Sequence, residues 1–386
     1  MRPAVLRSRV NEFQASLQEQ PRRAITFLCF FCQQSPVSFL QPEMSSSASN
    51  KENNASVVAS DAASDDPRRL LWVAAQEGRT TDLRALLQVA LATGGVHVAA
   101  DVLPALRVAA CNDHAAVVLA LLGTGAAGVD DQTDACPSPL WAASFYGSTD
   151  AALVLVQAKV DIDKATANYG RTPAFAAAWN GHTDSLQLLV HAKADIDKVT
   201  TDCGETPALV AALSGHTYSL QVLVHAKADI DKARTDHGTT PAFIAAENGD
   251  TDSLQVLVHA KADIDKARTD CGATPAFIAA QNMHTNSLQV LVQAAADVTR
   301  CLDGNGWCPL LVASGNGHLE VVRLLMDRAP QMFHVRTTAK HRRWGQCIAA
   351  GSAPVDVARQ LQRDRVVQLL AGEIASTGGQ PKSLRK

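Results

Sequence analysis

The sequence repeats itself every 34 residues, and this period limits the possible folds more than any other feature. Four Thr-Pro pairs recur at this spacing, and one similar pair before them and one after them bring the number of units in register to six. The units open at Ser138-Pro139, Thr172-Pro173, Thr206-Pro207, Thr240-Pro241, Thr274-Pro275 and Cys308-Pro309. A fixed period of roughly this length is typical of arrays in which each unit packs only on its neighbours.

Weaker copies of the unit flank the six regular ones. Arg69 opens "RLLWVAAQEGRTTDLRALL", Pro104 opens "PALRVAACNDHAAVVLALL" and Ala353-Pro354 opens "APVDVARQLQRDRVVQLL". The array therefore covers residues 68–371 in about nine units, which start near 69, 104, 138, 172, 206, 240, 274, 308 and 353.

Each unit carries the pattern of two short helices. A threonine before proline favours a helix start, because the threonine oxygen can accept a free amide hydrogen and proline suits the first helical position. "AFIAAEN" then forms about two turns and ends at Gly249. In "LQVLVHA", Leu254, Leu257 and Val258 share one helix face. Helices this short are unstable alone, so the copies must stack into a solenoid.

The segment between the helix pairs distinguishes two repeat classes. About ten residues, "ADIDKARTDHG", end in Gly238 and favour an extended finger with a tight turn. Tetratricopeptide repeats have a similar period, but their two longer helices fill almost the whole unit. The sequence therefore disfavours that class.

The residues of one unit resemble a known family. The stretch "GRTPAFAAAWNGHTDSLQLLVHAKADID" (170–197) is similar to an ankyrin repeat, with its G-x-TPLH-x-AA-x-x-GH pattern, Leu-rich second helix and final Ala-Asp. "NGWCPLLVASGNGHLEVVRLLMDRA" (305–329) fits the same pattern. The resemblance implies an all-α repeat solenoid of helix-turn-helix units joined by β-hairpin fingers, and a chain that binds proteins.

Two departures from the family pattern affect stability. Phe175, Leu209, Phe243 and Phe277 replace the histidine of the motif, so apolar packing must replace its hydrogen bond. Lysine stands where the family usually has glycine before Ala-Asp, at Lys159, Lys193, Lys227 and Lys261. If these lysines adopt left-handed backbone geometry, each costs about 1 kcal/mol. We expect an array less stable than an idealised one.

The repeated stretch "HAKADIDKARTD", at 225–236 and 259–270, could suggest a metal or catalytic site. However, His191, His225 and His259 occupy the same place in successive units, about 10 Å apart, whereas zinc ligands lie about 2 Å from one ion. Asp229 and Asp231 alternate along an extended segment and point to opposite sides. We interpret these residues as scaffold, with a turn-stabilising first aspartate and a solvated lysine. We predict no catalytic residues, metal or cofactor, and therefore no enzyme.

The two ends of the chain differ from the array. Residues 1–67 are expected to be disordered, since 44–67 is rich in Ser, Ala, Asn and Asp and offers little to bury. The apolar run Ala24–Cys32 follows several arginines, so 1–43 is either a weak leader or outside the working protein. That run is too short to span a membrane, and residues 372–386 are expected to form a flexible tail.

Charge and cysteine content restrict the partners and the compartment. The net charge of −3 does not favour nucleic acid, which requires clustered positive charge. Nine cysteines, an odd number, favour a reducing interior, either cytoplasm or nucleus. The one basic, partly aromatic stretch is Phe333–Ser352. We expect it to be an enlarged finger, with contact to an anion or a partner as the alternative.

The resemblance also indicates where a partner would bind, because ankyrin-type arrays use the finger tips and the exposed face of the first helix. Here the matching positions vary while the residues around them barely change. They are Tyr169, Arg171, Trp179, Asn180, Cys203, Glu205, Leu213, Ser214, His237, Thr239, Glu247, Asn248, Cys271, Ala273, Gln281 and Asn282. Trp179 is either an anchor for the partner or a cover for the neighbouring unit.

Two functions remain open from the sequence. The first is a monomeric, non-enzymatic scaffold or adaptor that binds a protein along the concave face. The alternative is a substrate-recruiting subunit of a ubiquitin ligase, kinase or phosphatase complex. In that case Phe333–Ser352 or the final "STGGQPKSLRK" would contact the catalytic partner.

Overall fold

The structure is a computed structural model that describes residues 67–93, 98–125, 130, 137–302, 304, 306–343 and 346–377. The expectations for the N-terminal segment up to residue 66 and for the last residues, 378–386, lie outside the described residues. A compact unit begins at Pro67, next to the expected start of the array. Its last helix continues to Thr377, beyond the expected end at 371.

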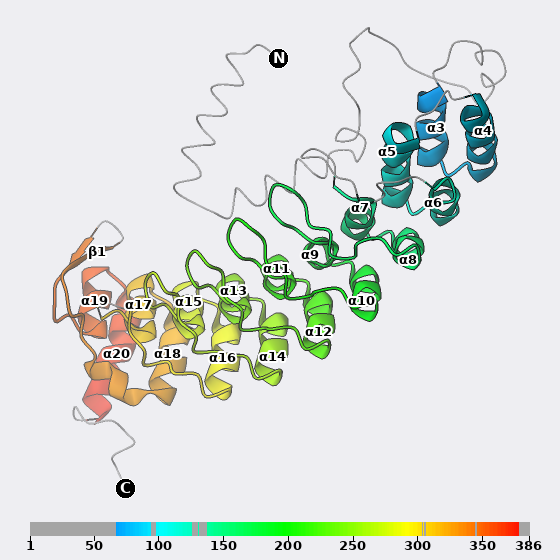
Figure 1. Ribbon diagram of the computed structural model, residues 1–386. Coiled ribbons are helices and arrows are strands. Elements are labelled where there is room, and N and C mark those ends of the chain that lie inside the picture. The colour runs from blue at the N-terminus through cyan, green and yellow to red at the C-terminus, as the bar shows by residue number, and fades with distance from the viewer. Residues whose placement is uncertain are drawn as a thin grey trace, which may run out of the picture. The chain divides into compact units, whose positions relative to one another are not determined.

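Among the described residues, nine helix pairs follow one another (Figure 1). The first helices are α3 (Pro67–Gln76), α5 (Val98–Cys111), α7 (Pro139–Tyr146), α9 (Pro173–Asn180), α11 (Pro207–Ser214), α13 (Pro241–Asn248), α15 (Pro275–Gln281), α17 (Pro309–Asn316) and α19 (Pro354–Gln360). The second helices are α4 (Thr80–Thr93), α6 (Ala115–Leu122), α8 (Thr149–Gln157), α10 (Thr183–His191), α12 (Thr217–His225), α14 (Thr251–His259), α16 (Thr285–Gln293), α18 (Leu319–Arg328) and α20 (Asp364–Thr377).

The helices form two layers along the array. Each first helix contacts the next first helix, as α9 contacts α11, and each second helix contacts the next second helix, as α12 contacts α14. This arrangement confirms the expected all-α solenoid of helix-turn-helix units.

The Thr-Pro pairs start the first helices as the sequence predicts. Thr206 has extended geometry, and its hydroxyl accepts the backbone N–H of Leu209 at 3.1 Å. Pro207 takes the first helical position, and the helix ends at Gly215, whose φ of 73° is left-handed. Cys308 precedes Pro309 without making a side-chain cap hydrogen bond.

The second unit begins earlier than the expected start near 104. Helix α5 starts at Val98 and contains Pro104 in its interior. The residue before this proline is Leu103, which has no side-chain oxygen to cap a helix. The missing cap does not by itself account for this difference, because Pro309 and Pro354 begin α17 and α19 without a side-chain cap hydrogen bond.

The fingers between the pairs are narrow. The backbone N–H of Thr200 donates to the carbonyl of Glu205 at 3.0 Å and closes one finger. The N–H of Thr201 donates to the carbonyl of Tyr169 in the preceding finger at 2.9 Å. Neighbouring fingers are therefore joined through their tips, and the central fingers are hairpin-shaped turns without a longer strand ladder.

The stretch Phe333–Ser352 forms an enlarged finger, as expected. A 3-10 turn, η1 (Pro330–His334), precedes the strands β1 (His341–Arg343) and β2 (Gln346–Ile348). The two strands pair antiparallel, with Arg342 opposite Cys347, and form the one sheet of the described residues. Contact of this finger with an anion or a partner stays a prediction.

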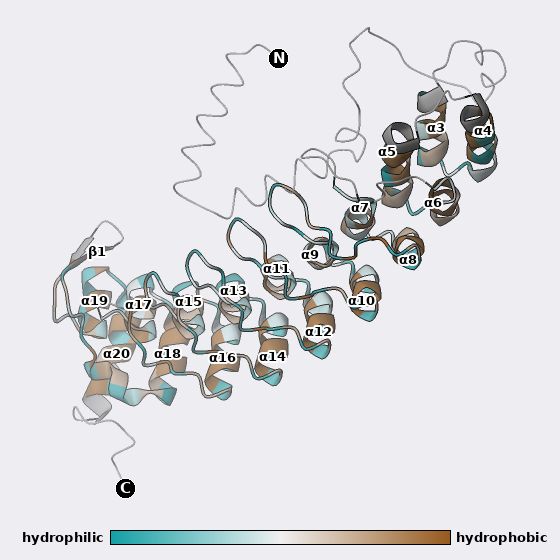
Figure 2. Ribbon diagram, in the orientation of Figure 1, coloured by the Kyte–Doolittle hydropathy of each residue, from teal (hydrophilic) through white to brown (hydrophobic). Residues whose placement is uncertain are grey.

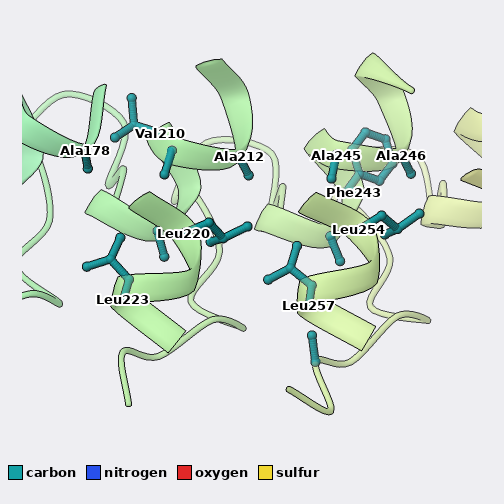
Figure 3. Close-up of a cluster of buried hydrophobic side chains, with 14 of the residues drawn as sticks. Ala178, Val210, Ala212, Leu220, Leu223, Phe243, Ala245, Ala246, Leu254 and Leu257 are labelled. Atoms are coloured by element: carbon teal, nitrogen blue, oxygen red, sulfur yellow. The ribbon is translucent and has the colours of Figure 1, made fainter. Parts of the chain in front are cut away.

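The core lies between the two helix layers. Leu220, Leu223, Leu254 and Leu257 of the second helices are fully buried beside the alanines of the first helices (Figure 3). Phe243, which replaces the motif histidine, is buried in the same layer, so apolar packing does substitute for the missing hydrogen bond. Figure 2 shows hydrophobic residues along α12, α14 and α16 and hydrophilic residues at the lower ends of these helices.

The lysines that replace glycine have the expected left-handed backbone. Their φ angles are 62° at Lys159, 70° at Lys193, 63° at Lys227 and 64° at Lys261. Each comes two residues after the last residue of a second helix, where the chain must turn toward the finger. A side chain with a Cβ is disfavoured there, so each position stores strain.

Candidate partner-binding face

The aspartates of the "ADID" stretch bind the backbone of the array. Oδ1 of Asp229 accepts the N–H of Asp231 at 3.1 Å, which stabilises the local turn. Oδ1 of Asp197 accepts the N–H of Asp229 in the next unit at 2.8 Å. The first aspartate therefore has the predicted turn-stabilising role, while the second joins two units.

The lysine after this pair has a further role that the sequence analysis did not assign. Nζ of Lys232 donates to the carbonyl of Asp197 in the preceding unit at 2.8 Å, and Nζ of Lys266 donates to that of Asp231 at 2.8 Å. The lysine is thus a tie between units and not only a solvated partner of the aspartates.

The histidines at the ends of the second helices bind their own helices. Nδ1 of His191 lies 2.7 Å from the carbonyl of Gln187, and Nδ1 of His259 lies 2.7 Å from that of Gln255. Over the part of the chain that the structure describes, no group of three or more His, Cys, Asp or Glu side chains could hold a metal ion.

A second row of histidines joins neighbouring units. Nε2 of His182 lies 3.0 Å from the carbonyl of Phe145, and Nε2 of His318 lies 3.0 Å from that of Gln281, each in the preceding unit. Burial lowers the pKa of both His182 and His318. Hydroxyl pairs such as Thr217 and Ser253, at 2.9 Å, connect the second helices in the same way. We call these unit-joining residues the frame.

The variable residues lie on what we call the finger–helix face, formed by the fingers and the adjoining side chains of the first helices. Of the sixteen predicted positions, Tyr169, Ser214, His237 and Asn248 are exposed. Ten are half-buried, namely Arg171, Trp179, Asn180, Cys203, Glu205, Leu213, Glu247, Cys271, Gln281 and Asn282.

The remaining two predicted positions, Thr239 and Ala273, do not belong to the accessible face. Each is only 5% exposed. Their carbonyls accept the backbone N–H groups of Arg234 and Arg268 across the finger at 2.9 Å, so each is the small member of a pair with a long arginine. Their assignment as partner contacts is therefore corrected.

The two asparagines at the ends of α13 and α15 also serve the frame. Nδ2 of Asn248 donates to the carbonyl of Leu213, and Nδ2 of Asn282 donates to that of Glu247, at 3.1 and 3.0 Å. Their amide groups are used between units, which leaves them less free to bind a partner.

One end of the finger–helix face is aromatic. The guanidinium carbon of Arg171 lies 4.7 Å from the ring centroid of Tyr169 and 4.5 Å from that of Trp179. Trp179 also makes an edge contact with Phe175 of its own helix, at 5.5 Å between centroids. Trp179 is thus held within its own unit and keeps part of its surface exposed.

The other end of the face is charged. Arg234 pairs with Glu205 at 3.1 Å and with Asp236 at 2.7 Å, and Arg268 pairs with Asp270 at 2.5 Å. Burial raises the pKa of Glu205, although Arg234 opposes this shift. The hydrogen bond from Arg268 lowers the pKa of Asp270 to about 2. The face therefore carries internally matched charges here.

The cysteines of the fingers are poor nucleophiles. Burial, followed by the charge of Glu205, raises the pKa of the Cys203 thiol to about 12. Burial also raises the pKa of Cys271. At neutral pH both side chains remain thiols, so they contribute shape and weak polarity to the face.

Sequence reasoning missed Arg234 and Arg268. These residues stand at the position of Thr166 and Thr200, on the first arm of the finger. The signal was the pairing across the finger, which places them opposite Thr239 and Ala273 and therefore on the same face. Using that signal would have required knowing which residues of the finger pair with each other.

A polar groove of about 530 Å³ lies elsewhere, along the second helices. It is lined by residues of three units, including Thr183, His216, Tyr218, Asp252 and His259. Tyr218 is 76% exposed. The groove is separate from the residues predicted from the sequence.

The geometry agrees with comparisons to known proteins. The family model for ankyrin repeats matches three times, at residues 106–201, 193–270 and 265–336, which together span more than half of the chain. The chain belongs to the ankyrin repeat family. Ankyrin repeats are protein–protein interaction modules, and no catalytic family is indicated.

A solved structure extends the comparison. The ankyrin repeat domain of Bcl-3, described as a unique member of the IkappaB protein family, is 25% identical with a TM-score of 0.52. The match covers 61% of this chain and 98% of that one. A search of curated protein sequences finds no significant match. Within the described residues, no helix combines the length and apolar character that a membrane crossing requires.

Proposed function

We propose that this ankyrin repeat protein is a non-enzymatic scaffold or adaptor that binds a protein partner along the finger–helix face. The contrast between frame and face carries the proposal. At the finger tips, successive units have Tyr169, Cys203, His237 and Cys271, whereas glycine follows each of them. The packing between units constrains the frame residues, whereas the tip residues are not needed for that packing and can serve to bind a ligand.

The use of polar groups supports the same proposal. The frame side chains Asp197, Lys232 and His182 bind backbone atoms of neighbouring units. By contrast, Tyr169 is exposed at its tip, where a partner can reach it, and His237 is exposed too, although its ring lies near the carboxylates of Asp236 and Asp270. We further propose that the chain acts as a monomer inside the cell, in the cytoplasm or the nucleus.

Proximity labelling in the source cell, followed by binding measurements with purified full-length chain, tests the function. The variant Trp179→Ala with Arg171→Ala is expected to lose partners while its circular dichroism spectrum stays helical. The matched control is Gln255→Ala with Gln289→Ala, two exposed residues of the second helices.

Two outcomes would count against the proposal. One is the recovery of no protein above background with the wild-type chain. The other is an equal loss of partners in the face variant and in the control. Co-purification of a ligase, kinase or phosphatase subunit would place the adaptor within an enzyme complex.

A further inference from the structure

Arg171 differs from the other arginines of the finger–helix face because it has no acidic partner. Arg234 and Arg268 each pair with an aspartate, at 2.7 and 2.5 Å. For Arg171, the described residues provide no carboxylate within ion-pair distance, and its buried Nε has no hydrogen-bond partner among them. A cation in this state retains unused hydrogen-bonding capacity.

The aromatic rings around Arg171 hold its guanidinium in place. Its central carbon lies 4.5 Å from the centroid of Trp179 and 4.7 Å from that of Tyr169. Phe175 lies farther away, at 5.6 Å. These cation–π contacts hold the group at the rings, and because Nε is buried, the terminal nitrogens are the donors that an external acceptor could reach.

The nearest acidic residue along the face is already engaged. Glu205 lies one finger further and pairs with Arg234 at 3.1 Å. Arg171 affects Glu205 only at longer range, where its positive charge opposes the rise that burial causes in the pKa of Glu205. Arg171 is therefore left to an external acceptor, one finger away from the Glu205–Arg234 pair.

The helix that precedes α9 in the first layer, α7, also carries aromatic side chains. On α7, Trp141 stacks on Phe145 at 4.9 Å, and Tyr146 makes an edge contact with Phe145 at 5.1 Å. Helices α7 and α9 are in contact. Tyr146 and Tyr169 are 37% and 47% exposed, and partly exposed aromatic rings of this kind are enriched in protein interfaces.

We propose that Arg171 is a docking point for one Asp or Glu side chain of the protein partner, beside an apolar partner residue that lies on Tyr169 and Trp179. This inference rests on the proposed function and specifies which chemical group of the partner Arg171 binds. A planar carboxylate can accept two parallel hydrogen bonds from a guanidinium edge. A phosphate carries about two negative charges, more than the single positive charge of Arg171 can balance.

Peptide selection on the immobilised full-length chain tests this chemistry. Short random peptides displayed on phage are selected, and the selected sequences are synthesised in matched forms. These forms carry the original acidic residue, its amide (Glu→Gln or Asp→Asn) or phosphoserine. We expect one acidic residue beside an apolar residue, and an amide form that binds the wild-type chain about tenfold more weakly.

Variants of the chain separate charge from shape. Arg171→Met keeps an unbranched side chain on the rings and should abolish the difference between acid and amide forms. Arg171→Lys should restore part of it, because a lysine keeps the charge but lacks the bidentate edge. The control is Arg323→Met, an exposed arginine of α18 whose partner Glu320 lies 3.6 Å away, and it should bind like the wild type.

Each other outcome has a defined meaning. Selected peptides without an acidic residue, equal binding of acid and amide forms, or tighter binding of phosphoserine forms would overturn the role of Arg171. If peptides bind and are lost in Trp179→Ala but not in Arg171→Met, the proposed function survives and this inference fails. If the wild-type chain selects no peptide at all, both fail.

Discussion

Asp250 occupies the position between units that histidine fills at the neighbouring junctions, and its Oδ2 lies 3.8 Å from the point where a Cβ would stand on Gly215. At the preceding junction, the imidazole of His216 lies within 2.6 Å of the same point on Gly181. Oδ1 of Asp250 caps its own helix by accepting the N–H of Ser253 at 3.1 Å. Its Oδ2 is buried and has no hydrogen-bond partner among the described residues.

The substitution Asp250→His is therefore expected to stabilise the array by about 1 kcal/mol, as measured by urea unfolding. The ring would fill the space over Gly215, and its Nε2 could reach the carbonyl of Leu213. That carbonyl already accepts Asn248, but the carbonyl of Gln281 accepts both Asn316 and His318 in the same arrangement.

The reverse change provides the control for this junction. His284→Asp should destabilise the array by about the same amount, because it removes a ring that lies 3.0 Å from the carbonyl of Glu247. Equal unfolding midpoints for the two variants and the wild type would show that this position does not limit the stability of the array.

Because the left-handed lysines are strained, replacing one of them by glycine should stabilise the array. Lys227→Gly should raise the free energy of unfolding by about 0.5–1 kcal/mol, because glycine accepts a φ of 63° without steric conflict. The control is Ala226→Gly at the preceding residue, where φ is −75°. That variant should lose stability, since glycine there only adds freedom to the unfolded chain.

Replacing the second aspartate of a finger should reduce the stability of the array, and the reduction should depend on the loss of the acceptor oxygen and not on the loss of charge. Asp197→Ala should cost about 1 kcal/mol, because the N–H of Asp229 loses its acceptor. Asp197→Asn keeps an acceptor oxygen and should recover most of this stability. A loss of equal size in both variants would point to the charge of Asp197 as the stabilising property.

The raised pKa of Glu205 predicts a pH dependence with a defined sign. Burial raises this pKa above the ordinary value of about 4.5 for a glutamate, so the folded chain holds the proton more tightly than the unfolded chain. The stability that Glu205 contributes is therefore present below pH 4.5 and is lost as the pH rises through the raised pKa. Glu205→Gln does not titrate, so its stability relative to wild type should increase between pH 4 and pH 7.

Thermal unfolding of the two proteins across this pH range measures the effect. Asp236 remains as a partner of Arg234 in the variant, at 2.7 Å, which limits the loss from the broken pair. A relative stability that stays constant or falls toward neutral pH would contradict the assigned shift.

Local capping chemistry made most of the array predictable from sequence. Thr206 before Pro207 marks a helix start in any surroundings, and a lysine at the glycine position requires left-handed geometry wherever the helix ends at the same place. Pro104 shows the limit of this reasoning, since it lies inside α5 and not at its start.

The binding face was less predictable, because it depends on pairing between chain segments. Thr239 was expected at the surface, but its place opposite Arg234 buries it. The contact of Trp179 with Arg171 and Phe175 likewise depends on how the finger folds back on α9. Periodicity identifies equivalent positions, whereas exposure at each one depends on the size of the residue across the finger.

The bonds between units also affect how the array can change in length. Asp197 binds Asp229, and Asp231 binds Asp263, through the same atoms at nearly the same distance, 2.8 and 2.9 Å. If one 34-residue unit were duplicated, the new copy would therefore have matching donors and acceptors on both neighbouring units. No further substitutions would be needed for it to pack between them. The identity of residues 225–236 and 259–270 is what such a duplication leaves in a sequence. Selection could in this way lengthen the binding surface first and diversify its tips afterwards.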